Sequence, residues 1–283
     1  MADNSVPNIY KHIPKKYIKK YHNPHYDDHM LSHPMRLVCV GSSGAGKTQL
    51  VVHIISKMRN TFTNIYVYTK NKDEPIYEWL LDKIPSGLTI KEGIDELPTL
   101  SKDKNGVVKG FEKPDEQSLV IFDDLVLLKD QSKIEELFIR GRKIAGGISI
   151  MYLTQSYFKV PKTIRINCTY IILKKLASTR DLNLILSDYN LGVSKETLLE
   201  IYKYCTRIKE EFLLLDLDAV PEQRFRRNLL EIIDIDTFNP KKPAPISSKN
   251  QVKPIEDVKP VETEFKQVPL ETKERAIVHQ VEY

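Results

Sequence analysis

Eight consecutive residues of the chain, from Gly41 to Thr48, have the types and the spacing of a loop that binds phosphate groups. They fit the pattern G-x-x-x-x-G-K-[ST]. Glycines let such a loop curl so that its main-chain N–H groups point inward, and the following helix adds its positive end. In that arrangement the Lys47 ammonium reaches the β- and γ-phosphates, and the Thr48 hydroxyl ligates Mg²⁺. The pattern therefore predicts a nucleotide site with Mg²⁺, formed by Gly41, Ser42, Ser43, Gly44, Ala45, Gly46, Lys47 and Thr48.

Two carboxylates follow the apolar run Ser118–Phe122, which has the character of a buried strand. Asp123, at the tip of this strand, can hold the water shell of Mg²⁺. Asp124 can orient and partly deprotonate the attacking water. Aspartate is one methylene shorter than the glutamate that is common at this place, so the water must sit closer or a second residue must help. Without the phosphate loop, the pair would fit two solvated acids in a turn.

A carboxamide follows the next predicted buried strand, Ile148–Leu153, in the pair Thr154-Gln155. The carboxyl end of a parallel strand lies beside the nucleotide in such sheets. Gln155 can therefore bond both the γ-phosphate and the attacking water, and so report which nucleotide is bound. Taken alone, Thr-Gln is a common way to cap a strand.

Two arginines, Arg140 and Arg142, end the helical stretch after the acidic strand. A guanidinium supplied to the phosphates during transfer accelerates it by about 10³–10⁵. From this position either arginine can face the nucleotide of a neighbouring subunit, and Arg165 is a second candidate for that role or for contact with DNA. Basic residues at the end of a helix also simply complement its dipole.

Apolar runs alternate with stretches of helical spacing between these residues. Such alternation predicts an α/β fold with a mostly parallel central sheet joined by helical crossovers. The predicted strands are Arg36–Val40, Asn64–Thr69, Ser118–Phe122, Ile148–Leu153 and Thr169–Leu173, with a late, antiparallel addition from Phe212–Leu217 and Phe225–Ile233. The predicted helices are Thr48–Lys57, Glu74–Leu81, Lys133–Lys143 and Ser178–Leu186.

Composition divides the 283 residues into three parts. Residues 1–35 are expected to form a basic polar arm, residues 36–238 one compact domain, and residues 239–283 a flexible tail rich in Pro, Lys and Glu. The net charge of +5 permits a nucleic-acid partner without indicating one. Three cysteines without a CxxC pair favour a reducing compartment, and no apolar run is long enough to span a membrane. Five of the seven histidines fall in the arm, but their spacing matches no known zinc-binding pattern. Tyr77 and Trp79, at helical spacing, are expected to pack in the hydrophobic core.

Taken together, the ordered motifs resemble a known family. The phosphate loop, LVIFDDL, RGRK and YLTQSYFKVPKTIR are similar to the genome-packaging ATPases of large double-stranded DNA viruses and virophages, the poxvirus-type branch of the FtsK–HerA superfamily. The similarity runs from about Pro34 to Ile235. It implies a P-loop NTPase three-layer sandwich that binds ATP and Mg²⁺ and forms a ring. It also implies that Lys47 binds phosphate, Asp123 holds Mg²⁺ and Asp124 is the catalytic acid.

The resemblance also assigns Gln155 as the sensor and favours Arg142 or Arg140 as the arginine finger. Its implied function is to pump a double-stranded genome into a preformed capsid, with a capsid or portal-type component as partner, in the host cytoplasm or a viral factory. Such a motor holds the DNA backbone through weak cation–phosphate contacts. The candidates for these contacts, besides the lysines of the arm, are Lys159, Lys162, Lys174, Lys175, Arg224, Arg226 and Arg227.

Two other functional classes fit a phosphate loop. A small-molecule kinase, for example one acting on nucleosides, needs an acceptor pocket and usually an arginine-rich lid, and it does not need Gln155 at a strand end. A non-catalytic nucleotide-binding scaffold does not need an intact set of Lys47, Thr48, Asp123 and Asp124. The residues therefore favour hydrolysis by water over both alternatives.

Overall fold

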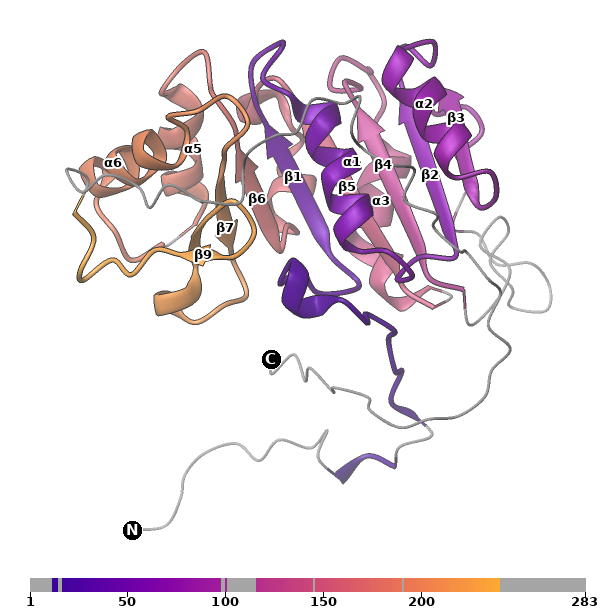
Figure 1. The fold of residues 1–283 in the computed structure, drawn as a ribbon, viewed down its shortest axis with the longest axis horizontal. Coiled ribbons are helices and arrows are strands. Elements are labelled where there is room, and N and C mark those ends of the chain that lie inside the picture. Colours follow the sequence, from indigo (N-terminus) through magenta and orange to yellow (C-terminus); the bar gives the residue numbers. More distant parts are fainter. Residues whose placement is uncertain are drawn as a thin grey trace, which may run out of the picture.

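A computed structural model describes residues 12–14, 17–97, 100, 116–144, 146–189 and 191–239 of the chain. They form a three-layer α/β structure in which one central sheet lies between two layers of helices (Figure 1). The sequence predicts this architecture, and the prediction is confirmed. The predicted tail, apart from Asn239, lies outside the described residues.

Within these residues a single sheet has the strand order β3-β2-β4-β5-β1-β6-β7-β8-β9. The first six strands in this order are parallel to one another, and β7, β8 and β9 each pair antiparallel with the strand before them. The strands are β1 (Arg36–Val40), β2 (Asn64–Thr69), β3 (Leu88–Glu92), β4 (Ser118–Asp123), β5 (Ile148–Thr154), β6 (Tyr170–Leu173), β7 (Leu213–Asp216), β8 (Phe225–Arg227) and β9 (Glu231–Ile232).

The central strands are the ones that the sequence predicts best. Every residue of β4, β5 and β6 is buried, because helices cover both faces of the sheet there. The edge strand β3 was not predicted, since its residues are half-exposed and its composition is mixed. One edge of the sheet, the upper edge in Figure 1, holds the C-terminal ends of β1, β2, β4, β5 and β6. We call it the carboxyl edge.

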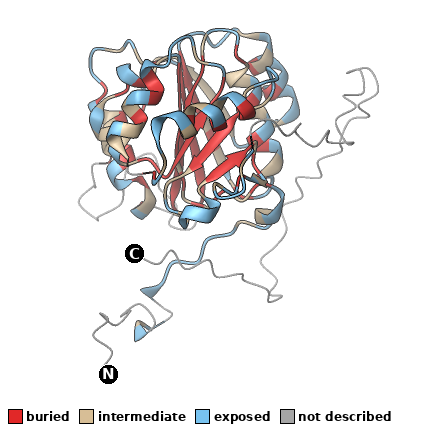
Figure 2. Cartoon of the chain, turned by 90° about the vertical axis from the view of Figure 1, so that its left-hand side faces the viewer, coloured by how far each residue is buried: buried red, intermediate tan, exposed pale blue. Residues whose placement is uncertain are grey.

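The two faces of the sheet carry different helices. Helices α1 (Lys47–Lys57) and α2 (Pro75–Lys83) pack with one hydrophobic cluster. The other cluster includes residues of α3 (Ser132–Arg140), α4 (Lys162–Ile166), α5 (Arg180–Asp188) and α6 (Lys195–Cys205). Figure 2 shows the buried strands between these partly exposed layers. Helices α4 and α6 were not predicted.

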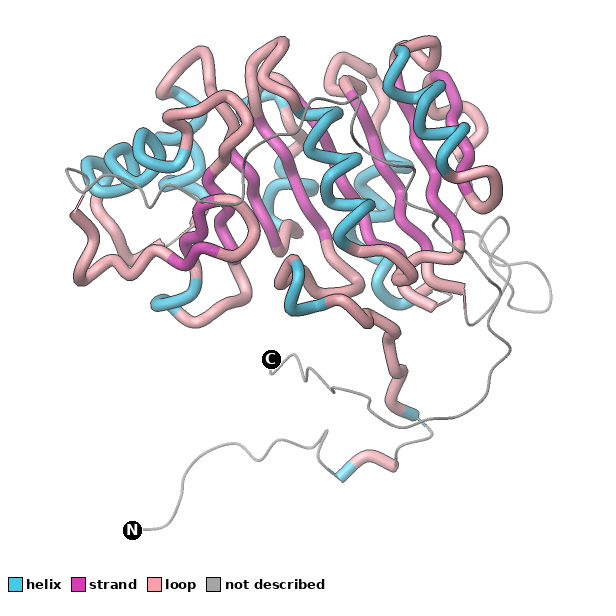
Figure 3. The backbone as a smooth tube through the Cα atoms, in the orientation of Figure 1, coloured by secondary structure: helices cyan, strands magenta, loops and turns pink. Residues whose placement is uncertain are grey.

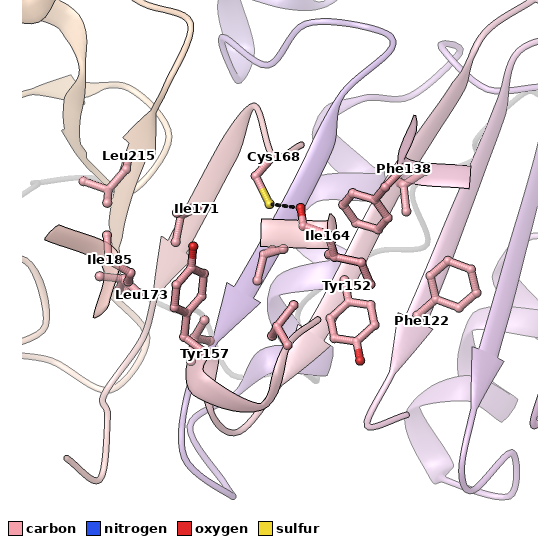
Figure 4. Packing of buried hydrophobic residues seen from close by; sticks show 14 of the residues in the cluster. Phe122, Phe138, Tyr152, Tyr157, Ile164, Cys168, Ile171, Leu173, Ile185 and Leu215 are labelled. Atoms are coloured by element: carbon pink, nitrogen blue, oxygen red, sulfur yellow. Dashed lines mark hydrogen bonds between the residues drawn. The ribbon is translucent and has the colours of Figure 1, made fainter. Parts of the chain in front are cut away.

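Alternate residues of β1 show how one strand contributes to both clusters. Leu37 and Cys39 belong to the cluster under α1, whereas Val38 and Val40 belong to the other. Figure 4 shows part of that second cluster, where aromatic side chains of β4, α3 and β5 lie close together. Strong burial on both faces leaves β1 firmly held, so the loop that follows it starts from a rigid position.

The late antiparallel strands confirm the expected addition to the sheet, but they change the assignment of two arginines. Arg226 and Arg227 are only 1% and 7% exposed, so they cannot serve as the predicted DNA contacts. Arg226 forms an ion pair with Asp216 (2.7 Å), and Arg227 pairs with Glu211 and Glu231. Guanidinium groups buried with carboxylates act as internal structural pairs.

From His22 on, the predicted arm packs on the domain instead of standing apart from it. Leu31 and Met35 are fully buried. His33 Nδ1 lies 2.7 Å from the Ser149 hydroxyl, at the edge of the sheet opposite the carboxyl edge. The main chain of His22 exchanges two hydrogen bonds with the Gln117 side chain. The packed part of the chain therefore begins before the predicted boundary at residue 35.

In the described part of the chain, no helix is both long and apolar enough to cross a lipid bilayer. Figure 3 shows the helices of the described residues as separate segments joined by loops.

Candidate functional site

The loop from Gly41 to Lys47 leaves the end of β1 and runs into α1 at the carboxyl edge. Both neighbouring strands hold it, since Gly41 N donates to the carbonyl of Thr154 (3.1 Å), the last residue of β5, and Ser42 N donates to the Lys175 carbonyl (2.9 Å) just after β6. Gly44 and Gly46 have φ of 70° and 77°, a conformation that side chains with a Cβ rarely adopt. These two glycines therefore let the loop curl as the pattern predicts.

Lys47 begins α1 and lies against this loop. Its Nζ donates to the carbonyls of Gly41 (3.0 Å) and Ser42 (3.4 Å). Gly46 precedes it as the residue that caps α1, so the ammonium and the positive end of the helix lie together. This combination of cation, dipole and curled main chain is suited to an anion with several charges.

Asp123 ends β4 beside α1, and its side chain is buried. The Thr48 hydroxyl donates to Asp123 Oδ2 (3.3 Å), so the two predicted Mg²⁺ residues touch. The Tyr77 hydroxyl of α2 donates to the same oxygen. Burial raises the pKa of Asp123, while the hydrogen bond from Tyr77 and the Lys47 ammonium oppose that rise. A hydroxyl and a carboxylate are oxygen ligands of the kind that Mg²⁺ prefers, so this pair fits the ion.

Asp124 and Gln155 meet across the ends of β4 and β5. Gln155 Nε2 lies 3.2 Å from each carboxylate oxygen of Asp124 and donates to them. Asp124 has a φ of 57°, which is uncommon for a residue other than glycine and which turns its side chain away from the direction of the strand. Residues held in such conformations cluster at functional sites. The second acid and the predicted sensor are thus in direct contact.

Two neighbours of these acids were not predicted. Tyr77, which the sequence suggests as a core residue, is fully buried and also bonds Asp123. Glu74, just before α2, is a third carboxylate near the site. Burial raises its pKa, and so do the negative charges of Asp123 and Asp124. No local pattern marks either residue, because α2 reaches the acids only through the pairing of β2 with β4.

A comparison with known families identifies the relatives of this chain. Residues 23–232 match the profile of the family described as Poxvirus A32 protein. This chain belongs to the poxvirus A32 protein family. The resemblance to poxvirus-type packaging ATPases, stated from the motifs, is therefore confirmed, and the match includes every predicted site residue of this A32-family protein.

The solved structures to which this A32-family protein is similar are remote from it in sequence. The genome packaging NTPase B204 from Sulfolobus turreted icosahedral virus 2, in complex with ATP-gammaS, is 16% identical over 70% of this chain and 98% of B204, with a TM-score of 0.47. ATPases 2 and 3 of EssC from Geobacillus thermodenitrificans are 12% identical over 72% of this chain and 40% of EssC, with a TM-score of 0.44. No curated protein sequence matches the chain.

The two predicted finger arginines of this A32-family protein lie far from its own phosphate loop. Arg140 and Arg142 precede β5, whose seven residues span about 20 Å before the carboxyl edge. Arg140 pairs with Glu136. Arg142 opposes the rise that burial causes in the pKa of Asp218. A role at the nucleotide of another subunit stays a prediction for both arginines.

The remaining basic candidates differ in exposure. Arg165 is largely buried, pairs with Asp188 and lies over the Tyr157 ring, so neither predicted role fits it. Lys174 is only 3% exposed and cannot reach DNA. Lys159, Lys162 and Lys175 are exposed, and Arg224 is half-buried.

Proposed function

We propose that this A32-family protein is a motor that hydrolyses ATP and uses the energy to move double-stranded DNA into a viral capsid. One observation carries the proposal. The phosphate loop, the Thr48–Asp123 pair and the Asp124–Gln155 pair meet at one edge of the sheet. Membership of the poxvirus A32 family supports the packaging role. Nothing in the comparisons supports a small-molecule kinase.

Each residue has a physical task in hydrolysis. The main-chain N–H groups of the loop and Lys47 bind the phosphates. Thr48 and Asp123 would hold Mg²⁺, which draws negative charge from the β- and γ-phosphates when bound. The oxygen of a water then forms a bond to the γ-phosphorus as the bond to the β–γ bridging oxygen breaks. Asp124 accepts a proton from this water, and the Gln155 carboxamide orients it, so the products are ADP and inorganic phosphate.

The proposal is tested by ATP hydrolysis with and without duplex DNA, measured on fractions separated by size. We expect duplex DNA to raise the rate in an oligomeric fraction. Lys47→Ala should abolish it, and Lys57→Ala, at the other end of the same helix, should not. A protein that hydrolyses no ATP in any fraction, with DNA present, would contradict the proposal. A rate that depends on a nucleoside and not on DNA would indicate the kinase.

A ring is the assembly that suits a trans arginine, because the arginine of one subunit then completes the site of the next. We expect Arg142→Ala to abolish turnover while ATP still binds. Mixing that variant with Lys47→Ala should restore part of the activity, because some interfaces then pair an intact loop with an intact arginine. If no mixing ratio restores activity, Arg142 does not act in trans, and the same mixture with Arg140→Ala tests the alternative.

The remaining assignments of the proposal concern partners and location. Lys159, Lys162 and Lys175 are exposed and available for contacts with the DNA backbone, whose signature is binding that weakens with salt regardless of sequence. A packaging motor also needs a capsid or portal-type component to dock on. Its place of action would be the cytoplasm or a viral factory of the infected cell.

A further inference from the structure

Lys174 is a lysine enclosed in the protein next to the phosphate loop. It follows β6, and its main-chain N donates to the Val40 carbonyl (2.9 Å), which continues the pairing of β6 with β1. Only 3% of the residue is exposed. A lysine is rarely buried to this extent unless a partner compensates its charge.

The side chain of Lys174 spans the loop from its first glycine to the start of α1. A Cβ added at Gly41 would lie 2.9 Å from Lys174 Cβ, and a Cβ added at Gly46 would lie 3.7 Å from Lys174 Nζ. The next residue also supports the loop, since the Lys175 carbonyl accepts hydrogen bonds from the Ser42 main chain and hydroxyl, both at 2.9 Å. Any residue larger than glycine at position 41 would displace Lys174.

The Lys174 ammonium has only weak compensation for its charge. It donates to the main-chain carbonyl of Glu210 (3.2 Å) and lies 5.8 Å from the centre of the Phe212 ring. In the described residues, no carboxylate lies within ion-pair distance of Lys174 Nζ. Burial lowers the pKa of this amine. Its Nζ lies beside Gly46, the residue that caps α1, so the positive end of this helix repels it.

We propose that Lys174 is a second cation of the phosphate site, which raises the affinity of the loop for polyphosphates. The inference rests on the proposed nucleotide site and adds a residue to it. A buried positive charge beside the positive end of a helix is unfavourable alone and becomes favourable when an anion binds nearby. Because the interaction is electrostatic, it grows with the number of phosphate charges. Lys174 therefore favours a triphosphate over a monophosphate.

Replacing the lysine with an uncharged residue of similar length separates this role from packing. We expect Lys174→Met to weaken binding of Mg²⁺–ATPγS by about three- to tenfold at low salt, ADP by less, and AMP within about twofold. The affinity of the variant should also fall less steeply with added salt. The matched control is Lys203→Met, which removes the same charge from an exposed side chain of α6. We expect it to bind all three nucleotides like the unmodified protein.

Binding is measured by calorimetry on the full chain, with melting temperatures recorded in parallel. Should Lys174→Met not fold, Lys174→Gln removes the charge and keeps an N–H donor. Equal losses for ATPγS, ADP and AMP would show that Lys174 only supports the loop, and unchanged affinities would show that its charge is not felt. Either result overturns the inference. If the unmodified protein binds no ATPγS, the nucleotide site itself fails, which is a separate outcome.

Discussion

Replacing Tyr77 with phenylalanine removes one hydroxyl group from the site and leaves the ring in place. The ring is fully buried in the cluster under α1 and α2, so the substitution changes little of the packing. What it does remove is the hydrogen bond from Tyr77 to Asp123 Oδ2. That oxygen keeps the bond from the Thr48 hydroxyl (3.3 Å) alone.

The size of the expected change in Mg²⁺ binding follows from the strength of the hydrogen bond that Tyr77→Phe removes. A hydrogen bond to a charged group contributes about 1.5–3 kcal/mol, and it orients the buried carboxylate toward Thr48. If about half of this free energy serves to position Asp123 for the ion, the loss is about three- to tenfold in binding. We therefore expect the Mg²⁺ concentration that gives half-maximal hydrolysis to rise about three- to tenfold in Tyr77→Phe. The loop binds phosphate through its main chain, so ATP binding in EDTA should stay within about twofold.

The assay is a Mg²⁺ titration of ATP hydrolysis at fixed ATP, joined to a titration of ATPγS binding with and without Mg²⁺. The control is Tyr68→Phe, which removes the same atom from a tyrosine that is also buried but packs in the other hydrophobic cluster. We expect the control to keep the Mg²⁺ requirement of the unmodified protein. The reasoning is refuted if the two variants have the same Mg²⁺ requirement, or if Tyr77→Phe weakens binding equally with and without Mg²⁺.

Three further predictions, made with four substitutions, test other parts of the structure. Asp124→Asn should bind Mg²⁺–ATP normally yet hydrolyse it at least 100-fold more slowly in a single-turnover assay. Asp123→Asn should instead lose Mg²⁺-dependent binding. The reverse pattern would exchange the roles of the two acids. Burial lowers the pKa of His33 to about 4, so the unfolded chain takes up a proton before the folded one does. Stability should therefore fall by up to about 3 kcal/mol between pH 6.5 and 4, and urea titrations should show a smaller fall in His33→Gln. Arg226→Met leaves Asp216 buried without its partner, so unfolding should occur about 10 °C lower; an unchanged midpoint would contradict a structural role.

The central strands could be predicted because burial on both faces leaves a signature in the sequence itself. Ser118–Asp123 and Ile148–Thr154 lie between two layers of helices, so almost every position must be apolar. The edge strand Leu88–Glu92 has a neighbour on one side only, and its mixed composition resembles that of a loop. Helix α6 does have a local signal in the sequence, the serine at position 194 just before it. The Ser194 hydroxyl accepts a hydrogen bond from Thr197 N and so caps the helix.

Predictions from charge and composition were wrong for residues whose structural partners lie far away in the sequence. The segment before β1 is rich in histidine and lysine, yet His33 is buried against Ser149, more than one hundred residues later. Arg226 was assigned to DNA contact although it pairs with Asp216 inside the sheet addition. A basic residue has the same appearance in a sequence whether it faces solvent or a buried carboxylate. Only the fold distinguishes the two cases.

The site divides into a part that was predictable and a part that was not, and the division follows the chemistry. Phosphate binding in the loop rests on consecutive main-chain groups, on two glycines with positive φ and on Lys47, all within eight residues. A local motif can describe such a structure completely. Asp123, Asp124 and Gln155 were also predicted, but the contacts that fix the acids, from Tyr77 to Asp123 and from Gln155 to Asp124, form only in the folded sheet.

Nucleotide binding and hydrolysis are expected to depend on side chains to different degrees. Ser42, Ser43 and Ala45 contribute mainly N–H groups to the predicted phosphate cradle, so their side chains carry little of the binding. In the proposed mechanism, hydrolysis requires a water aligned to within a fraction of an ångström, and contacts such as Gln155 to Asp124 would hold that alignment. A single atom removed from those contacts therefore affects the chemical step more than the binding step. Variants of the acids and their partners can thus produce a protein that holds the nucleotide firmly and turns it over slowly.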